Sequence, residues 1–189
     1  MKHDICIEKY GVRLRPVCLE DAPYIHQLRL NTENVKYIGD TDQNLLHQHE
    51  WIIKYEETEG DYYFCVEDIR GSKLGTIGLY NVSEKEAEWG RWIISEKYLL
   101  APTIVLILYD IAFYKLNLQS VYCRTIIENE KVVSFHDSCG LLQEGIERGG
   151  VTIRGEKRDL IVHRLDKQNY ENTVRRKLEK IARFSERIM

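Results

Sequence analysis

A change of hydrophobic period near the middle of the chain most restricts how it can fold. Residues 87–94 read as a β-strand, Pro102 fits the first turn of a helix, and residues 118–127 are again rich in β-formers. Between them, apolar residues recur at helical spacing: Val105, Leu106, Leu108, Tyr109, Ala112 and Phe113. A strand, a helix and a second strand in succession predict one right-handed crossover, which makes the two strands parallel.

Shorter elements surround this crossover. The β-rich residues 61–67 and 74–80 flank a turn at 70–73 and predict a hairpin. Asn129 is placed to begin a helix that stops at Gly140. The other expected elements are a first strand at 12–15, a helix opened by residues 20–23, a helix at 45–53 with Trp51 on its buried side, and last strands at 141–147 and 158–165. The order predicts an α/β fold with a mixed sheet covered by helices.

The C-terminal residues 169–189 predict an amphipathic helix. Its apolar residues are Val174, Leu178, Ile181, Ala182 and Ile188. This stripe packs either on its own domain or on a second copy in a homodimer, and the pattern does not choose between them. We expect one domain over residues 1–166 and a helical extension over 167–189.

Composition and charge narrow the class of protein. The chain has 189 residues, 43% of them hydrophobic, which suits one folded domain. A net charge of −3 argues against a nucleic-acid partner, because phosphate binding needs a concentrated positive field. The longest apolar stretch, 98–109, is too short to span a membrane. Five cysteines without a C-x-x-C pair indicate a reducing, cytoplasmic setting and no zinc site. His47 and His49 are two apart on a helix, so we expect no metal there.

Short motifs from about residue 12 to residue 165 resemble one enzyme family. They are residues 12–16 with Glu20 and Asp21, residues 74–79, residues 87–90, Ala112 with Phe113, Asn129 with Phe135, Gly140 with Leu141, and Glu144 with Gly145. On these motifs the chain resembles the GNAT superfamily of acetyl-CoA-dependent N-acetyltransferases. It looks most like two branches, one acetylating protein N-termini, especially of ribosomal proteins, and one acetylating nucleotide-linked amino sugars.

The resemblance implies a mostly antiparallel central sheet that is splayed in the middle, with acetyl-CoA as co-substrate. It implies Glu88 as a carboxylate near the amine, acting as base directly or through water. Counting seven residues from Asn129 gives His136 as proton donor to the leaving sulfur, where relatives usually have tyrosine. The implied cofactor-binding residues are Trp92, Ile93, Ile94, Lys97, Leu99, Leu100, Ala101, Thr103, Asn129 and Ser134.

One feature departs from the family. The phosphate-binding loop usually has glycines where this chain has Lys97 and Leu99. The helix-end amides do not depend on glycine, so acetyl-CoA stays the expected donor. A degenerate, non-catalytic module that binds acyl-CoA or interacts with a partner is the alternative from another class.

The expected acceptor is a primary amine on a small molecule, such as an amino sugar or its nucleotide conjugate, and the alternative is a protein N-terminus. We expect Asn31, Tyr37 and Trp51 to contact it. Plainer interpretations remain for three site residues: Glu88 as a solvent-facing acid paired with Arg91, Asn129 as a helix cap, and His136 as a half-buried surface histidine.

Overall fold

One eight-stranded sheet forms the centre of the protein. The computed structural model describes residues 3–31, 36–94 and 98–187. The strand order is β1-β2-β3-β4-β5-β6-β8-β7, and every neighbouring pair is antiparallel except β5–β6. The strands are β1 (Ile7–Lys9), β2 (Val12–Pro16), β3 (Tyr62–Asp68), β4 (Lys73–Tyr80), β5 (Glu86–Ile94), β6 (Ser120–Ile126), β7 (Leu142–Ile153) and β8 (Glu156–Asp166). The predicted mixed, mostly antiparallel sheet and its one parallel crossover are confirmed.

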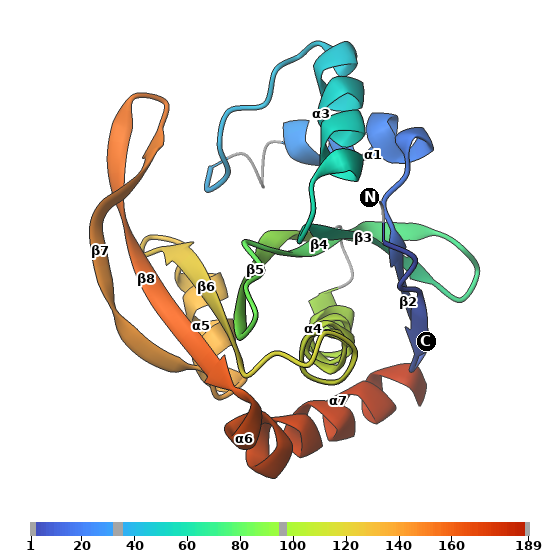
Figure 1. The fold of residues 1–189 in the computed structure, drawn as a ribbon, viewed down its shortest axis with the longest axis vertical. Coiled ribbons are helices and arrows are strands. Elements are labelled where there is room, and N and C mark those ends of the chain that lie inside the picture. Colours follow the sequence, from blue (N-terminus) through green and yellow to red (C-terminus); the bar gives the residue numbers. More distant parts are fainter. Residues whose placement is uncertain (1–2, 32–35, 95–97, 188–189) are drawn as a thin grey trace.

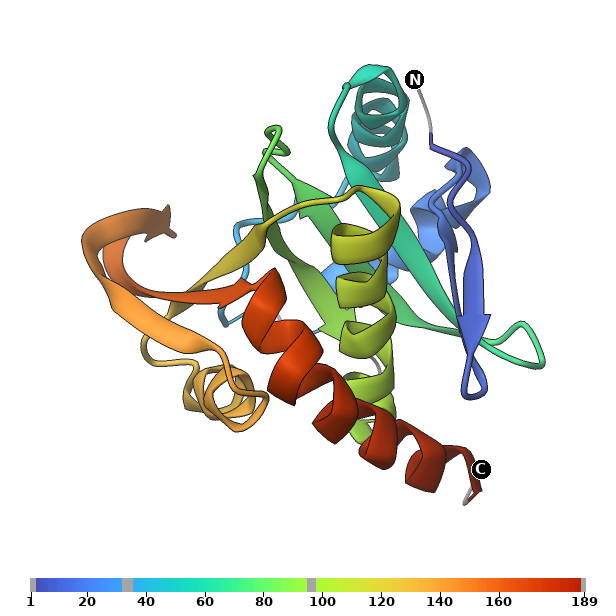
Figure 2. The same ribbon diagram turned by 60° about the horizontal axis from the view of Figure 1, so that its bottom comes forward.

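Helices cover both faces of this sheet (Figure 1). α1 (Ala22–Leu30) and α3 (Leu45–Glu57) lie on one face, and α4 (Ala101–Asp110) lies on the other. α5 (Glu130–Ser138) is on the α4 side, and Figure 2 shows α7 (Arg175–Arg187) crossing α4 as an outer layer. The remaining helical turns are η1 (Leu19–Asp21), η2 (Tyr98–Leu100), η3 (Ile111–Lys115), α6 (Lys167–Asn169) and η4 (Tyr170–Val174). None of the helices in the described ranges is long and apolar enough to span a membrane.

The main core lies between the sheet and α4. Nine of the ten α4 residues are buried, because this helix has the sheet on one side and α7 on the other. The C-terminal segment adds Tyr170, Val174, Leu178 and Ala182 to the same apolar cluster, so most of the predicted stripe packs on its own domain. Ile181 of that stripe is 38% exposed, and Ile188 lies outside the described residues. A buried polar contact fixes the segment further, since the Tyr170 hydroxyl donates to Asp110 over 2.7 Å. A separate cluster fills the space under α1 and α3.

Several local features differ from the sequence expectations. β1 was not predicted, and it is a three-residue strand at the sheet edge. The prediction that Trp51 lies on the buried side of its helix is wrong: the side chain is 39% exposed, and Ile52 and Tyr55 face the core instead. The last two strands are longer than expected. They meet in a two-residue turn at Arg154 and Gly155, both with positive φ, which suits a twisted hairpin.

Candidate active site

The sheet opens between β5 and β6. These parallel strands pair at three positions, Glu86 with Ser120, Ala87 with Val121 and Glu88 with Tyr122. Beyond Glu88, β5 continues to Ile94 beside β4 and β6 continues to Ile126 beside β8, with no further β5–β6 pair in the described residues. Two strands that part leave backbone N–H and C=O groups for a ligand. The splay implied by the family resemblance is present.

A β-bulge shapes the β5 side of this opening. Gly78 pairs with Gly90 and Thr76 pairs with Ile93, so β5 has one extra residue between them. Arg91 lies in the bulge with φ of 50°, and its carbonyl accepts a hydrogen bond from the Thr76 hydroxyl over 3.0 Å. Because of the extra residue, Arg91 lies on the same face as Glu88, three residues earlier, and both contact Tyr80. The Arg91 guanidinium lies 5.1 Å from the Trp51 ring of α3, whereas the next residue contacts α5.

Glu88 lies where the two strands part, on the face covered by α1 and α3. The residue is 3% exposed, and its carboxylate accepts four hydrogen bonds. Arg124 of β6 donates two of them over 2.9 and 3.0 Å, the Asn81 amide donates one over 3.0 Å, and the Tyr80 hydroxyl donates one over 3.3 Å. The plainer interpretation, a solvent-facing acid paired with Arg91, is therefore wrong. Arg91 pairs instead with Asp61 over 2.5 and 2.8 Å.

The α4 side of the opening is aromatic and uncharged. The Trp92 ring lies 4.9 Å from Phe135 of α5, and His136 lies 5.0 Å from Trp89. Burial, aided by the neighbouring His163, lowers the pKa of His136 to about 3. His136 is therefore neutral at pH 7, and it is buried rather than a surface residue. It can donate a hydrogen bond through an N–H group, but it holds no ionisable proton at that pH.

The residues implied for acetyl-CoA lie along one edge of the opening. Trp92, Ile93 and Ile94 form the end of β5, which lies beside β4 but has no described pairs with β6. Leu100, Ala101 and Thr103 are buried at the amino end of α4, Leu99 is exposed, and Lys97 lies outside the described residues. Asn129 precedes α5 without capping it through its side chain, and Ser134 is exposed on that helix.

Unpaired polar atoms mark the same edge. The buried Trp92 Nε1, His136 Nδ1 and Thr103 Oγ1 atoms have no hydrogen-bond partner in the described structure. Buried polar atoms are normally paired, so unpaired ones are candidates to bind a polar ligand. Together with the strand splay, they fit a pantetheine arm, whose amides offer donors and acceptors.

A cavity of about 370 Å³ lies on the opposite face, between α1, α3 and the loop before α3. Its lining includes Trp51, a predicted acceptor contact, and Arg91. The other lining residues are Ile25, His26, Arg29, Asp40, Thr41, Asp42, His47, Gln48 and Tyr63. The two other predicted contacts lie apart from this lining. Tyr37 donates its hydroxyl to the Glu128 carbonyl over 2.8 Å, and Asn31 ends α1.

Sequence reasoning missed Arg124, Tyr80 and Asn81, which surround Glu88. No short motif marks them, because their proximity depends on strand register. Arg124 is two residues beyond Tyr122, the register partner of Glu88, and therefore on the same face of the sheet. A basic residue at alternating spacing in β6 was a usable signal once the parallel pairing was assumed.

Comparisons with known proteins agree with this geometry. Residues 12–142 match the family model described as an acetyltransferase (GNAT) domain. A spermidine N(1)-acetyltransferase of Escherichia coli (strain K12) is 28% identical over 158 residues, covering 80% of this chain and 84% of the relative.

Two solved structures share the fold. The Vibrio cholerae spermidine N-acetyltransferase in complex with CoA and spermine has a TM-score of 0.79 at 24% identity, over 87% of this chain and all of that one. Apo FdhC, a nucleotide-linked sugar GNAT, has a TM-score of 0.77 at 26% identity, over 96% of this chain and 99% of that one.

Proposed function

Since the chain belongs to the GNAT acetyltransferase family, we propose that it acetylates the primary amine of an amino sugar carried on a nucleotide. At the coarser level it is an acetyl-CoA-dependent N-acetyltransferase acting on small-molecule amines. The observation that carries the proposal is the position of Glu88, a buried carboxylate where the sheet opens, on the same face of the sheet as the 370 Å³ cavity and beside its lining residue Arg91 through Tyr80.

Glu88 takes the proton that the acceptor amine must lose. Its longest hydrogen bond, 3.3 Å from the Tyr80 hydroxyl, is the weakest of the four and is the one the amine or a bridging water replaces. Burial and the Glu88 charge raise the pKa of Tyr80 well above its usual value, so this phenol stays protonated and acts as a donor. Arg124 holds the carboxylate in place through two charge-assisted bonds.

The transfer itself exchanges one bond for another. Acetyl-CoA supplies the acetyl group as a thioester. The neutral amine nitrogen bonds to the acetyl carbon and loses a proton towards Glu88, while the carbon–sulfur bond breaks and the sulfur leaves with the bonding electrons and gains a proton. The neutral His136 stabilises the leaving sulfur by donating an N–H hydrogen bond, and solvent supplies the proton.

The residues that hold acetyl-CoA are those along the open edge of β5 and the first turn of α4. The backbone of residues 92–94 binds the pantetheine arm. The N–H groups of Leu99, Leu100, Ala101 and Thr103 bind the diphosphate at the positive end of the helix, where Pro102 has no N–H to offer. Asn129 and Ser134 approach the arm from α5.

The charges around the cavity favour an acceptor that carries both signs. The lining contains two carboxylates, Asp40 and Asp42, and two guanidinium groups, Arg29 and Arg91, of which Arg91 already pairs with Asp61. A nucleotide-linked amino sugar presents an ammonium group to the acids and a diphosphate to Arg29. The likeness to a nucleotide-linked sugar GNAT over 96% of this chain supports the same class.

A polyamine is the second candidate. The E. coli relative that matches 80% of this chain is a spermidine N(1)-acetyltransferase, which favours it. Against it, spermidine carries several positive charges, which Arg29 in the cavity lining would repel.

A panel of amines tests both candidates. Purified protein is incubated with acetyl-CoA and a nucleotide-linked amino sugar, the free amino sugar, spermidine or a short peptide with a free N-terminus. Thiol release gives the rate and mass spectrometry identifies the product. We expect kcat/KM for the nucleotide-linked sugar to exceed the others by about tenfold or more, a barrier difference of about 1.4 kcal/mol. A tenfold preference for spermidine would refute the amino-sugar acceptor in favour of a polyamine. If none of the amines gives an acetylated product, the proposal is refuted.

A further inference from the structure

We propose that the carboxyl-terminal end of α7 forms part of the acetyl-CoA site and contacts the adenosine end of the cofactor. This inference rests on the proposed binding of the diphosphate at the amino end of α4. It assigns a ligand to an exposed apolar patch made of Leu99, Ile181 and Phe184, here called the α7 patch.

The last turns of α7 lie directly beside the first turn of α4. Ser185, which is buried, donates its hydroxyl to the Leu99 carbonyl over 3.1 Å. Leu99 is 67% exposed and Phe184 is 64% exposed, while Ile181 is 38% exposed. Three large apolar side chains therefore face solvent next to the helix end where the diphosphate binds. Exposed apolar groups gathered in this way indicate a contact surface.

The patch lies on the flank of α7 that faces α5. Gly140, just after α5, lies against Val174: a Cβ atom built on Gly140 would be 3.0 Å from the Val174 side chain. The flank of the C-terminal helical segment that carries Val174 therefore adjoins the end of α5. Ile181 is seven residues beyond Val174 and Phe184 is three further, which keeps both near that flank. The opposite flank contacts the β1–β2 turn, where the Tyr10 hydroxyl donates to Glu179 over 2.6 Å. The α7 patch thus borders the space between α4 and α5, on the side of the sheet where the opening lies.

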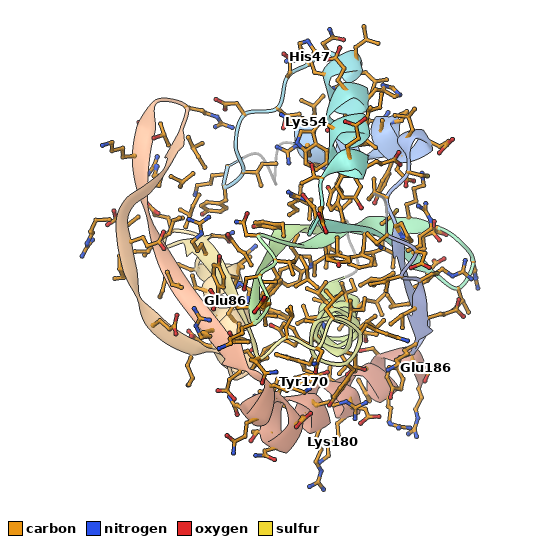
Figure 3. All side chains as sticks on the ribbon, in the orientation of Figure 1. His47, Lys54, Glu86, Tyr170, Lys180 and Glu186 are labelled. Atoms are coloured by element: carbon orange, nitrogen blue, oxygen red, sulfur yellow. The ribbon has the colours of Figure 1, made fainter. Side chains whose placement is uncertain are left out.

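The charge of α7 suits a ligand with several phosphates. The helix has six basic residues and two acidic ones, a net charge of +4 in a chain whose net charge is −3. Arg175 and Arg183 pair with acids, but Arg176 and Lys180 make no ion pair within the described parts of the chain. Lys180 projects outward from the helix (Figure 3). CoA carries a diphosphate and a 3′-phosphate, so a positive helix beside an apolar patch matches its adenosine end.

Phe184→Ala tests the inference by equilibrium binding. CoA and adenosine 3′,5′-bisphosphate are titrated into wild-type and variant protein by isothermal calorimetry, with no acceptor and no turnover. We expect the variant to bind both ligands about 5- to 30-fold more weakly, as for the loss of one base–aromatic contact. Leu46→Ala is the matched control, because Leu46 is 65% exposed on α3, far along the chain from this site, and should leave both affinities unchanged. Both side chains are mostly exposed, so neither variant should unfold.

The other outcomes separate this inference from the function on which it rests. If wild-type protein binds CoA and Phe184→Ala binds it equally well, the α7 patch is not part of the site, while the transferase proposal stands. If sedimentation shows a wild-type dimer that Phe184→Ala dissociates without loss of CoA affinity, the patch is a subunit interface and the inference is wrong. If wild-type protein does not bind CoA, the inference and the transferase proposal fail together.

Discussion

Replacing Glu88 with glutamine tests the chemistry most directly. The substitution keeps the size of the side chain but replaces one acceptor oxygen with a donor NH₂ group. Each Glu88 oxygen accepts two hydrogen bonds, one of them from Arg124. Two of the four donors would therefore face the new NH₂ group instead of an acceptor. Losing a partner of a charged hydrogen bond costs about 1.5–3 kcal/mol. The Arg124 side chain is 36% exposed and can regain water, so we expect the lower part of this range.

The assay separates stability from catalysis. A loss of about 2 kcal/mol should lower the melting temperature by roughly 4–8 °C in a protein of this length. At a temperature where the variant is fully folded, kcat should fall by roughly 10²- to 10⁴-fold, the usual effect of removing a general base. The Kd for CoA should change less than threefold, about 0.6 kcal/mol, because the cofactor residues lie beyond Glu88 on β5.

Glu86→Gln is the matched control. Glu86, labelled in Figure 3, lies two residues earlier on the same face of β5. It is also held by an arginine, Arg164, over 2.5 Å. It lies within the paired part of the sheet, opposite Ser120, so its loss should leave kcat within about threefold of wild type. Retained turnover in Glu88→Gln, or equal losses of turnover and CoA affinity, would refute the base role.

Two further variants test the structure around the opening. Protonation of His136 should destabilise the protein, because the unfolded histidine takes up a proton near pH 6.5 and the native one only near pH 3. As the pH is lowered from 6.5 to 3, the unfolding free energy should therefore fall by up to about 1.4 kcal/mol per pH unit. His136→Phe should remove that component. Identical dependence of stability on pH in the variant and the wild type would contradict the lowered pKa. Gly75→Ala should cost about 1–3 kcal/mol and weaken CoA binding, because its methyl group would lie 2.1 Å from the Ile93 carbonyl of β5. Gly145→Ala is its control, because no atom lies within 4 Å of the added methyl group. Equal melting temperatures and equal CoA affinities of the two variants would contradict the expected clash with β5.

Local patterns predicted the elements of the fold but not their exact lateral contacts. The helical period after Pro102 identified α4 and therefore the parallel β5–β6 pair, because such a crossover has one handedness. The exposure of Trp51 could not be predicted from its helix alone. Its ring packs beside Arg91, which the β-bulge directs to that face, and a bulge leaves no clear mark in the sequence.

The site shows the same division between local and long-range information. Glu88 was found because it lies within a motif, whereas Arg124 is 36 residues away and meets it only through strand register. His136 was found by counting from Asn129. Its lowered pKa depends on burial beside Trp89 and His163, which belong to β5 and β8.

The two faces of the opening have different electrostatic properties because successive β5 side chains, such as Glu88 and Trp89, point to opposite faces of the sheet, and this difference fits the proposed direction of proton transfer. On the α3 face, Glu88 is surrounded by Arg124, Tyr80 and Asn81, which all donate hydrogen bonds to its carboxylate. On the α4 face, His136 is neutral among aromatic rings, where a positive charge is costly. In the proposed reaction, an amine that enters on the α3 face therefore gives up its proton on the side where Arg124 and neutral hydrogen-bond donors offset a negative charge. The leaving sulfur, on the apolar side, meets a hydrogen-bond donor but no strong acid. In the proposed reaction the acetyl group is transferred at the opening between β5 and β6, while the proton of the amine stays on the α3 face.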